Sequence, residues 1–266
     1  ADMLDDPSLC LFDTRFSLEH PEQGRFDFAA GHIPGARYLH LDEDLSARIV
    51  PGVTGRHPLP EPALLQTRLR RAGLNKDAQV VVYDDGPGLF AARLWWLLRW
   101  LGHTQVRVLN GGLQAWNTVK LPLSQETPRP VAEGNFTGTA DPGKLLEAAD
   151  IVARLEDPSW QLLDARGPAR FSGESEPIDP VAGHIPGAAN LPCAGNIGPS
   201  GEWLNPEQLE ARFAPWLNSG KESLVLNAKD PADKALLSAM LERADVFVQN
   251  LRPGAIEALG FDYATL

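Results

Sequence analysis

Short apolar runs alternate with segments that carry apolar residues at helical spacing in the first half of the chain. Val80–Tyr83 is a β-branched run followed by the loop residues Asp84-Asp85-Gly86-Pro87-Gly88, which predicts a strand that ends in a loop. Ala91–Leu101 has helical spacing with Gly102 placed to end the helix, and Val106–Leu109 predicts the next strand. Strand, helix and strand in this order favour parallel pairing through a crossover helix, so the pattern predicts an α/β fold.

The chain contains an internal repeat. Residues 1–15 (ADMLDDPSLCLFDTR) resemble residues 152–166 (VARLEDPSWQLLDAR), and the AGHIPGA block of Ala30–Ala36 returns at Ala182–Ala188. Two matched blocks in the same order and at nearly the same spacing indicate a duplicated domain. These two parts of the chain are called the first copy and the second copy.

The repeat predicts two domains joined by a linker. We expect a first domain over residues 1–122 and a second over residues 144–266. Residues 123–143 between them are rich in Pro, Gly, Thr and Ser and show no periodicity, which is typical of a linker.

The start of the second copy predicts a helix over Lys144–Leu155 and a strand over Gln161–Asp164. The counterpart of that helix in the first copy would lie before Ala1. We therefore expect the sequence to begin inside its first structural unit.

Composition and charge narrow the classes of partner. The 266 residues are 43% hydrophobic and 22% charged, which is typical of a globular protein. The formal net charge of −11 argues against nucleic acid and anionic membranes as partners, and an anionic substrate would need a local positive site. No apolar run approaches the ~20 residues that span a bilayer, and no signal peptide is visible at the N-terminus. Two cysteines are too few for a disulfide framework, so a cytoplasmic protein is expected.

Several motifs together resemble the tandem rhodanese family, which includes thiosulfate and 3-mercaptopyruvate sulfurtransferases. They are LFDTR, LLDAR, the two AGHIPGA blocks, VVYDDGPGLFAARLWWLLRWLGH and VRVLNGGLQAW. The resemblance covers about residues 1–220 and implies two tandem rhodanese-like domains, each a mainly parallel sheet flanked by helices. It implies no cofactor.

Conspicuous polar and aromatic residues in these motifs are expected to be structural rather than catalytic. They are His32 and His184 in Gly/Pro turns, Asp13 and Asp164 at strand ends, and Trp95, Trp96 and Trp100 as core residues. The six histidines show no metal-ligand spacing with either cysteine, so no metal is expected.

Sulfane-sulfur transfer, the activity that the resemblance implies, needs a thiolate that holds sulfur as a persulfide. An ordinary thiol has a pKa near ~8.5, so the site must lower that value. In the family, backbone N–H groups of a strand-to-helix loop converge on the sulfur. In the first copy this position falls on Asp85, whose carboxylate cannot form a persulfide, so the first copy is expected to be inactive.

The second copy does not supply the missing thiol. The comparable strand is Leu224–Leu226, and Asn227-Ala228-Lys229-Asp230-Pro231 follows it without a cysteine. Cys193 has no helix N-terminus or basic cluster near it in the sequence, and Cys10 lies in a strand where packing is expected. We therefore assign no catalytic residue and predict negligible sulfur transfer.

One part of the substrate apparatus is retained in the second copy. Asp164–Phe171 (DARGPARF) resembles the family segment whose second arginine positions the anionic end of the donor. The resemblance gives that role to Arg170, with Arg166 beside it as the other candidate substrate-binding residue. The implied partner is a small anionic sulfur donor, and no protein partner can be inferred. A solvated surface charge is the alternative for Arg170.

The end of the chain resembles a different family. From about Ser223 the sequence, with ADVFVQN, RPG and EALGFDY, resembles an N-terminal piece of a family III CoA-transferase. That family's catalytic aspartate lies further downstream, so a complete CoA-transferase is not expected. The pattern predicts a strand at Leu224–Leu226, a helix over Ala232–Ala244 and a strand at Asp245–Val248. We expect this foreign strand–helix–strand segment, residues 223–266, to replace the active-site loop and complete the second sheet.

Four interpretations remain open from the sequence. The chain is a degenerate sulfurtransferase, a non-catalytic binding or regulatory module, or a chimera without selected function. The fourth is CoA binding by the tail, for which we expect no CoA-dependent stabilisation.

Overall fold

The computed structural model describes residues 3–4, 6–127, 131–157, 159–217 and 230–241. The chain divides into two compact units, Ala1–Trp216 and Leu217–Leu266. In the second unit the structure describes helix α8 (Pro231–Leu241), which agrees with most of the helix predicted over Ala232–Ala244. The two strands predicted at Leu224–Leu226 and Asp245–Val248 lie outside the described residues.

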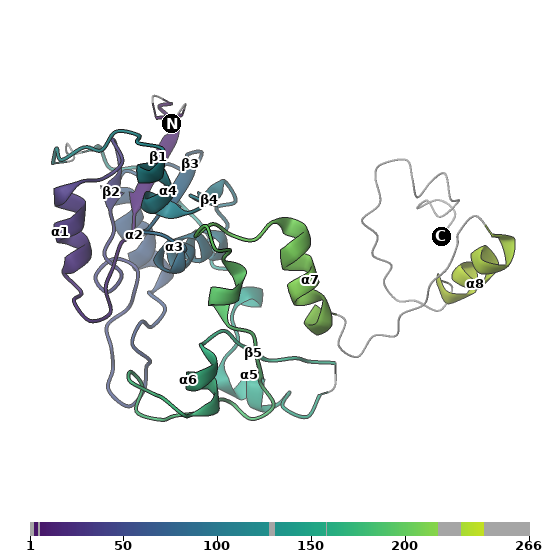
Figure 1. Ribbon diagram of the computed structural model, residues 1–266. Helices are drawn as coiled ribbons and strands as arrows, with labels where there is room; N and C mark the ends of the chain where they lie inside the picture. The colour runs from purple at the N-terminus through teal and green to yellow at the C-terminus, as the bar shows by residue number, and fades with distance from the viewer. Residues whose placement is uncertain (1–2, 5, 128–130, 158, 218–229, 242–266) are drawn as a thin grey trace. The chain divides into compact units, whose positions relative to one another are not determined.

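A four-stranded parallel sheet forms the centre of the first copy (Figure 1). Its strands are β1 (Leu9–Asp13), β2 (Arg37–Tyr38), β3 (Gln79–Tyr83) and β4 (Val106–Val108), in the order β2-β1-β3-β4. All three neighbouring pairs are parallel, and the register sets Asp13 opposite Tyr83, so β1 and β3 end at the same level. The strands predicted from the apolar pattern and the α/β class are confirmed.

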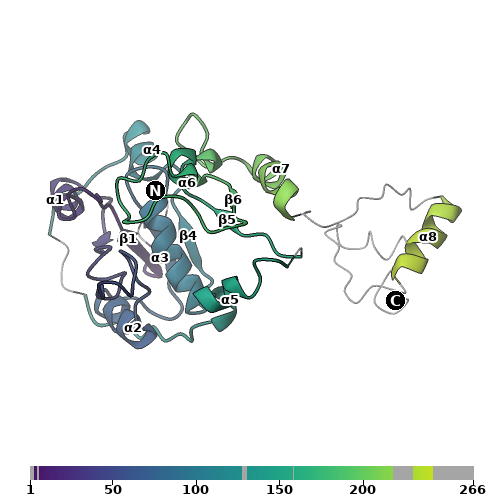
Figure 2. The same cartoon turned by 90° about the horizontal axis from the view of Figure 1, so that it is seen from below.

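Helices cover both faces of this sheet, as Figures 1 and 2 show from two directions. They are α1 (Gln23–Ala30), α2 (Pro62–Arg71), α3 (Leu89–Trp100) and α4 (Gly112–Thr118). Side chains of β1 alternate between the faces, because Cys10 and Phe12 pack with α2 and α3 while Leu11 packs with α1 and α4. None of the helices in the described part of the chain is long and apolar enough to cross a membrane.

Helix α3 is the apolar helix that the sequence predicts, and it ends as predicted. Leu101 caps it, and Gly102 follows with a φ of +87° that favours glycine. Trp100 is buried and Trp96 packs against the core, but Trp95 is 37% exposed, so the prediction that all three are core residues is wrong for Trp95. Trp95 faces outward, where the Arg99 guanidinium lies 5.9 Å from its ring centroid.

The segment predicted as a linker packs along the first copy. The backbone N–H groups of Phe136, Thr139 and Asp141 donate to the carbonyl oxygens of Leu74 (3.1 Å), Leu101 (3.1 Å) and Trp100 (2.9 Å). Phe136 is 1% exposed and belongs to the core between the sheet and helices α2 and α3. The residues that lead to the second copy therefore also stabilise the first.

The second copy contains a smaller parallel pair, β5 (Leu163–Asp164) and β6 (Ala189–Asn190). Its helices are α5 (Ala148–Val152), α6 (Pro168–Ser172) and α7 (Pro206–Leu217), with 3₁₀ helices at Pro142–Lys144 and Cys193–Asn196. The predicted helix and strand at its start are both shorter than expected. A capping box between Glu147 and Asp150 starts α5 four residues later than the predicted Lys144.

The two copies differ in how much apolar surface they bury. In the first copy β1 has a strand on each side, whereas in the part that the structure describes β5 pairs with β6 alone. None of the described residues from 137 to 215 is buried, and Trp160, Val181 and Ile185 are among the exposed apolar side chains. A strand paired on one edge leaves unpaired backbone groups on the other.

His103 is a buried histidine through which the stability of the first copy is expected to depend on pH. The ring is 6% exposed, packs edge-to-face on Phe136, and its Nε2 has no hydrogen-bond partner among the described residues. Burial lowers the pKa of His103 below its usual value of about 6.5, and backbone groups of Ala78 and Gln105 offset part of this.

The pKa of His103 is lower in the folded chain than in the unfolded chain. Its contribution to the free energy of unfolding is therefore complete above about pH 6.5 and is lost as the pH falls towards the folded pKa. The free energy of unfolding, measured with urea, should decrease between about pH 7.5 and about pH 5.5. This decrease should be smaller for His103→Gln than for the parent chain. Equal losses in both proteins would contradict this assignment.

Candidate functional site

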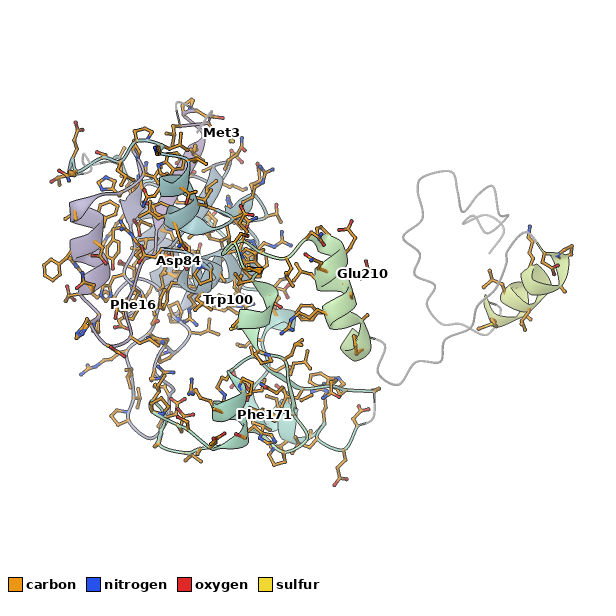
Figure 3. The ribbon with its side chains drawn as sticks, in the orientation of Figure 1. Met3, Phe16, Asp84, Trp100, Phe171 and Glu210 are labelled. Atoms are coloured by element: carbon orange, nitrogen blue, oxygen red, sulfur yellow. The ribbon has the colours of Figure 1, made fainter. Side chains whose placement is uncertain are left out.

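Four backbone N–H groups converge on the carboxylate of Asp84, in the loop between β3 and α3. Oδ1 accepts from Gly86 and Gly88, each at 3.0 Å, and Oδ2 accepts from Phe90 at 2.9 Å and Ala91 at 3.2 Å. The residue is 3% exposed and lies among the side chains around the four-stranded sheet (Figure 3). We call these four N–H groups the amide cradle.

The amide cradle follows from local backbone chemistry. Phe90 and Ala91 lie in the first turn of α3, where N–H groups have no partner within the helix, and Gly86 and Gly88 belong to the loop before it. Gly88 has a φ of +83°, a conformation that glycine adopts without strain and that lets the loop turn back towards Asp84. The arrangement stabilises one negative charge at the end of β3.

The sequence predicts this convergence at Asp85, and the structure places it one residue earlier, at Asp84. The Asp85 side chain is 68% exposed, and its carboxylate lies 3.9 Å from Nη1 of Arg15. Strand β3 ends at Tyr83, so the next side chain, Asp84, turns inward and Asp85 points to the rim. The chemical consequence predicted for the loop is unchanged, because a carboxylate at either position cannot hold sulfane sulfur.

Arg15 joins the end of β1 to the AGHIPGA turn of the first copy. Its Nε donates to Oδ2 of Asp13 at 2.9 Å, and its Nη2 donates to the carbonyl oxygen of Gly31 at 2.8 Å. The Arg15 and Asp13 side chains are 5% and 0% exposed, so the ion pair is buried, and further hydrogen bonds satisfy both partners. Its place at a strand end and a turn is that of a structural clamp.

Arg166 makes the same two contacts in the second copy. Its Nη2 lies 2.7 Å from Oδ2 of Asp164 and donates to the carbonyl oxygen of Gly183 at 2.6 Å. Nη1 also reaches Glu176 at 3.4 Å. This repetition gives Arg166 the partners of a structural clamp, and the predicted contact with a substrate stays a prediction.

Arg170 lies in a cluster of carboxylates. Its Nε donates to Glu176 at 3.0 and 3.1 Å, and its Nη2 also pairs with Asp179. The hydrogen bond from Arg170 lowers the pKa of Glu176 to about 2, so Glu176 is charged at neutral pH. The guanidinium predicted to hold an anionic donor is thus paired already, and an incoming anion would have to displace Glu176 or Asp179.

Residues of the first copy that the sequence alone does not single out approach this cluster. Nε of Arg56 donates to Oδ1 of Asp179 at 3.1 Å, across a separation of 123 residues. Next to Arg56, Nε2 of His57 lies 3.1 Å from Oδ1 of Asp42. Burial lowers the pKa of His57, and Asp42 acts in the opposite direction. No motif marks these residues, since their partners are brought to them only by the fold.

The two cysteines occupy different environments. Cys10 is 3% exposed, and burial raises its pKa to about 11, although Nη1 of Arg37 lies 3.2 Å from the sulfur. Its predicted packing role is confirmed. Cys193 is an exposed free thiol at the start of a 3₁₀ helix, and its backbone N–H donates to the carbonyl oxygen of Ala165 at 2.8 Å.

Among the described residues, Glu22, His40 and Glu43 are near enough to one another to be considered as metal ligands, with ligand atoms within 4.8 Å. Nδ1 of His40 accepts the N–H groups of Asp42 (3.2 Å) and Glu43 (3.3 Å), so the proton of a neutral ring is on Nε2. That nitrogen is the one facing Glu22, at 3.6 Å. A protonated nitrogen cannot ligate a metal, so the cluster does not fit one.

Two protein families match different parts of the chain. The rhodanese-like domain family matches residues 1–118, which include the four-stranded sheet and the amide cradle. CoA-transferase family III matches residues 197–266, in agreement with the resemblance of the tail.

Curated proteins similar to this chain include the probable 3-mercaptopyruvate sulfurtransferase of Pseudomonas aeruginosa, 50% identical over 82% of this chain and 76% of that protein. The 3-mercaptopyruvate sulfurtransferase of Escherichia coli is 31% identical over 96% of this chain and 90% of that protein. An Escherichia coli crystal structure that describes the rhodanese fold of 3-mercaptopyruvate sulfotransferases aligns with a TM-score of 0.70 at 32% identity, covering 83% of this chain and 81% of that one.

Proposed function

The chain belongs to the rhodanese family of sulfurtransferases, and we propose that it keeps the scaffold of that family without carrying sulfur itself. One observation carries the proposal: neither strand-to-helix loop offers a thiol, because the amide cradle of the first copy holds the carboxylate of Asp84 and residues 227–231 of the second copy contain no cysteine. Cys10 is buried with a raised pKa, which opposes thiolate formation. Cys193 is an exposed free thiol, and the N–H groups of the cradle are bonded to Asp84 instead.

The scaffold proposed is a tandem of two related domains, over residues 1–122 and 144–266, with 123–143 between them. Two repeated features support this. Asp164 and Asn190 are paired across β5 and β6 as Asp13 and Tyr38 are across β1 and β2. The arginine two residues after each aspartate makes the same carboxylate and glycine contacts in both copies.

For the tail we propose that residues 223–266 complete the sheet of the second copy. The support is that β5 has one strand neighbour in the described part of the chain, where β1 has two. We expect the amide groups of residues 224–226 to exchange slowly with deuterium, because a paired central strand protects them. Exchange at the rate of an unfolded peptide would contradict the proposal.

The substrate class that we propose to fit the scaffold is a small anionic sulfur donor, such as thiosulfate or 3-mercaptopyruvate. The names of the relatives support the class, and Arg170 supports a place for its anionic end. Since Glu176 and Asp179 occupy the guanidinium, we expect binding to be weak unless one of them moves aside.

Thiocyanate formation from thiosulfate and cyanide tests the absence of sulfur transfer. We expect a rate no higher than the protein-free background, unchanged in Cys193→Ser and Cys10→Ala, because the amide cradle holds Asp84 and neither thiol. A rate above background that disappears in Cys193→Ser would identify Cys193 as a sulfur carrier and overturn the proposal.

A binding or regulatory module is the second candidate function. The Arg170 cluster favours it, because a guanidinium between two displaceable carboxylates can recognise an anion without a nucleophile. Saturable thiosulfate binding without thiocyanate formation, weakened in Arg170→Gln, would support this candidate.

A further inference from the structure

A cavity of about 370 Å³ lies beside the AGHIPGA turn of the first copy. One wall is this turn, which leads from α1 into β2, and the other is the segment that follows α4. The walls include His32, Arg37, Ser124, Glu126 and Val131. None of the residues that line the cavity belongs to the amide cradle or to the Arg170 cluster, so it is separate from the sites described above.

Hydrogen bonds join the two walls of the cavity. The backbone N–H of His32 donates to the carbonyl oxygen of Ser124 at 2.9 Å, and the N–H of Ser124 donates back to the carbonyl oxygen of His32 at 2.8 Å. Nε2 of Gln125 adds a hydrogen bond to the carbonyl oxygen of Ala30 at 2.9 Å. These bonds fix the position of Ser124 relative to the AGHIPGA turn, so the side chains of the two walls face a common space.

Arg37 brings a positive charge to the cavity. Its Nη1 donates to the carbonyl oxygen of Ala72 at 2.6 Å and lies 3.2 Å from Sγ of Cys10. No carboxylate of the described residues forms an ion pair with Arg37, although the net charge of the chain is −11. Its Nε and Nη2 have no hydrogen-bond acceptor in the described part of the chain, so they can donate to a ligand. A guanidinium with such a pair of donors suits a carboxylate.

Two acceptors line the same cavity. The His32 ring is 3% exposed, and its Nδ1 lies 2.8 Å from the carbonyl oxygen of Phe28, which can only accept. Nδ1 therefore carries the proton, and Nε2 of the neutral ring is an acceptor to which no described residue donates. The other acceptor is the carboxylate of Glu126. It forms no ion pair with Arg37, so a ligand has room between the two charges.

The second copy separates the structural part of this arrangement from the rest. Its His184 stacks on Phe171 as His32 stacks on Phe28, and Nδ1 of His184 lies 2.7 Å from the carbonyl oxygen of Phe171. The position that Arg37 has in β2 falls on an alanine, Ala189, in β6. The histidine stack therefore serves the fold in both copies, whereas the guanidinium is an addition of the first copy that its fold does not require.

We propose that this cavity binds a free α-amino acid with an apolar side chain. The carboxylate of the ligand pairs with Arg37, the ammonium group donates to Nε2 of His32 and lies towards Glu126, and the side chain packs on Ala36 and Val131. A zwitterion offers one charge of each sign to a cavity lined by one of each. The volume lies within the range of about 300–1,000 Å³ that is usual for small-molecule sites.

Three molecules with the same branched apolar end test the two charged ends separately. L-leucine has both charges, 4-methylpentanoate lacks the ammonium group, and 3-methylbutylamine lacks the carboxylate. Equilibrium dialysis against the full chain at low ionic strength measures each dissociation constant. We expect L-leucine to bind at least about tenfold more tightly than either analogue, because each analogue leaves one charged group of the cavity without its partner.

Matched variants assign the two ends of the ligand to residues. Arg37→Gln should weaken the binding of both L-leucine and 4-methylpentanoate at least about tenfold, because both carry the carboxylate. Glu126→Gln should weaken the binding of L-leucine but not that of 4-methylpentanoate, which has no ammonium group. Arg48→Gln and Glu19→Gln make the same changes of charge at exposed positions outside the cavity, and they should leave both affinities unchanged.

The different effects of Glu126→Gln on the two ligands cannot come from misfolding, because a misfolded variant would lose both. Three results would overturn the proposal. They are no detectable binding of L-leucine to the parent chain, equal affinities for L-leucine and 4-methylpentanoate, and equal effects of Arg37→Gln and Arg48→Gln. Each of them leaves the absence of sulfur transfer standing, since that is measured on Cys10 and Cys193.

Discussion

Replacing Asp84 with alanine is expected to lower the free energy of unfolding by at least about 3 kcal/mol, because four backbone N–H groups lose their acceptor together. Gly86, Gly88 and Ala91 are buried, so water cannot readily replace the carboxylate. A hydrogen bond to a charged acceptor contributes about 1.5–3 kcal/mol, and the four are not additive. Urea unfolding followed by circular dichroism measures the change.

Asp85→Ala is the matched control. The two aspartates are adjacent and carry the same charge, but the Asp85 side chain is 68% exposed, and the N–H groups of the cradle are not bonded to it. We expect Asp85→Ala to change stability by no more than about 0.5 kcal/mol. Similar losses for both variants would show that the amide cradle does not hold Asp84 in solution.

Asp84→Cys is expected to create a thiol with a pKa below the ordinary value of about 8.5. The reason is that the amide cradle offers N–H donors to whichever anion stands at the end of β3. Cys10 provides the contrast, since burial without such a cradle raises its pKa to about 11. Thiolate absorbance measured against pH in a Cys193→Ser background reports the titration of the introduced thiol.

Asp85→Cys in the same background is the control for this experiment. Its side chain would lie at the exposed rim, where we expect a pKa close to about 8.5. An introduced thiol at position 84 that titrates at or above the value at position 85 would contradict the idea that the cradle stabilises a thiolate.

The elements of the first copy could be predicted from the sequence because their apolar pattern is strong. The β-branched run of β3 and the helical spacing of α3 each correspond to one buried face. The second copy was predicted less well. There the capping box at Glu147 and Asp150, rather than the apolar spacing, decides where α5 begins.

The sequence predicts which loop forms the site, but not which residue of that loop accepts the N–H groups. The glycine spacing locates the strand-to-helix loop, yet it does not tell which of two adjacent aspartates turns inward, and the end of β3 at Tyr83 decides for Asp84. The contact between Arg56 and Asp179 spans 123 residues, and no local pattern reports such a contact.

The central claim is that neither copy offers a sulfur carrier, because the amide cradle of the first copy holds the Asp84 carboxylate and residues 227–231, the loop predicted in the second copy, contain no cysteine. Mass spectrometry of the intact chain after exposure to thiosulfate or 3-mercaptopyruvate tests it most directly. We expect no mass increase of one sulfur atom on Cys10 or Cys193. A persulfide on either cysteine that is removed by cyanide would contradict it.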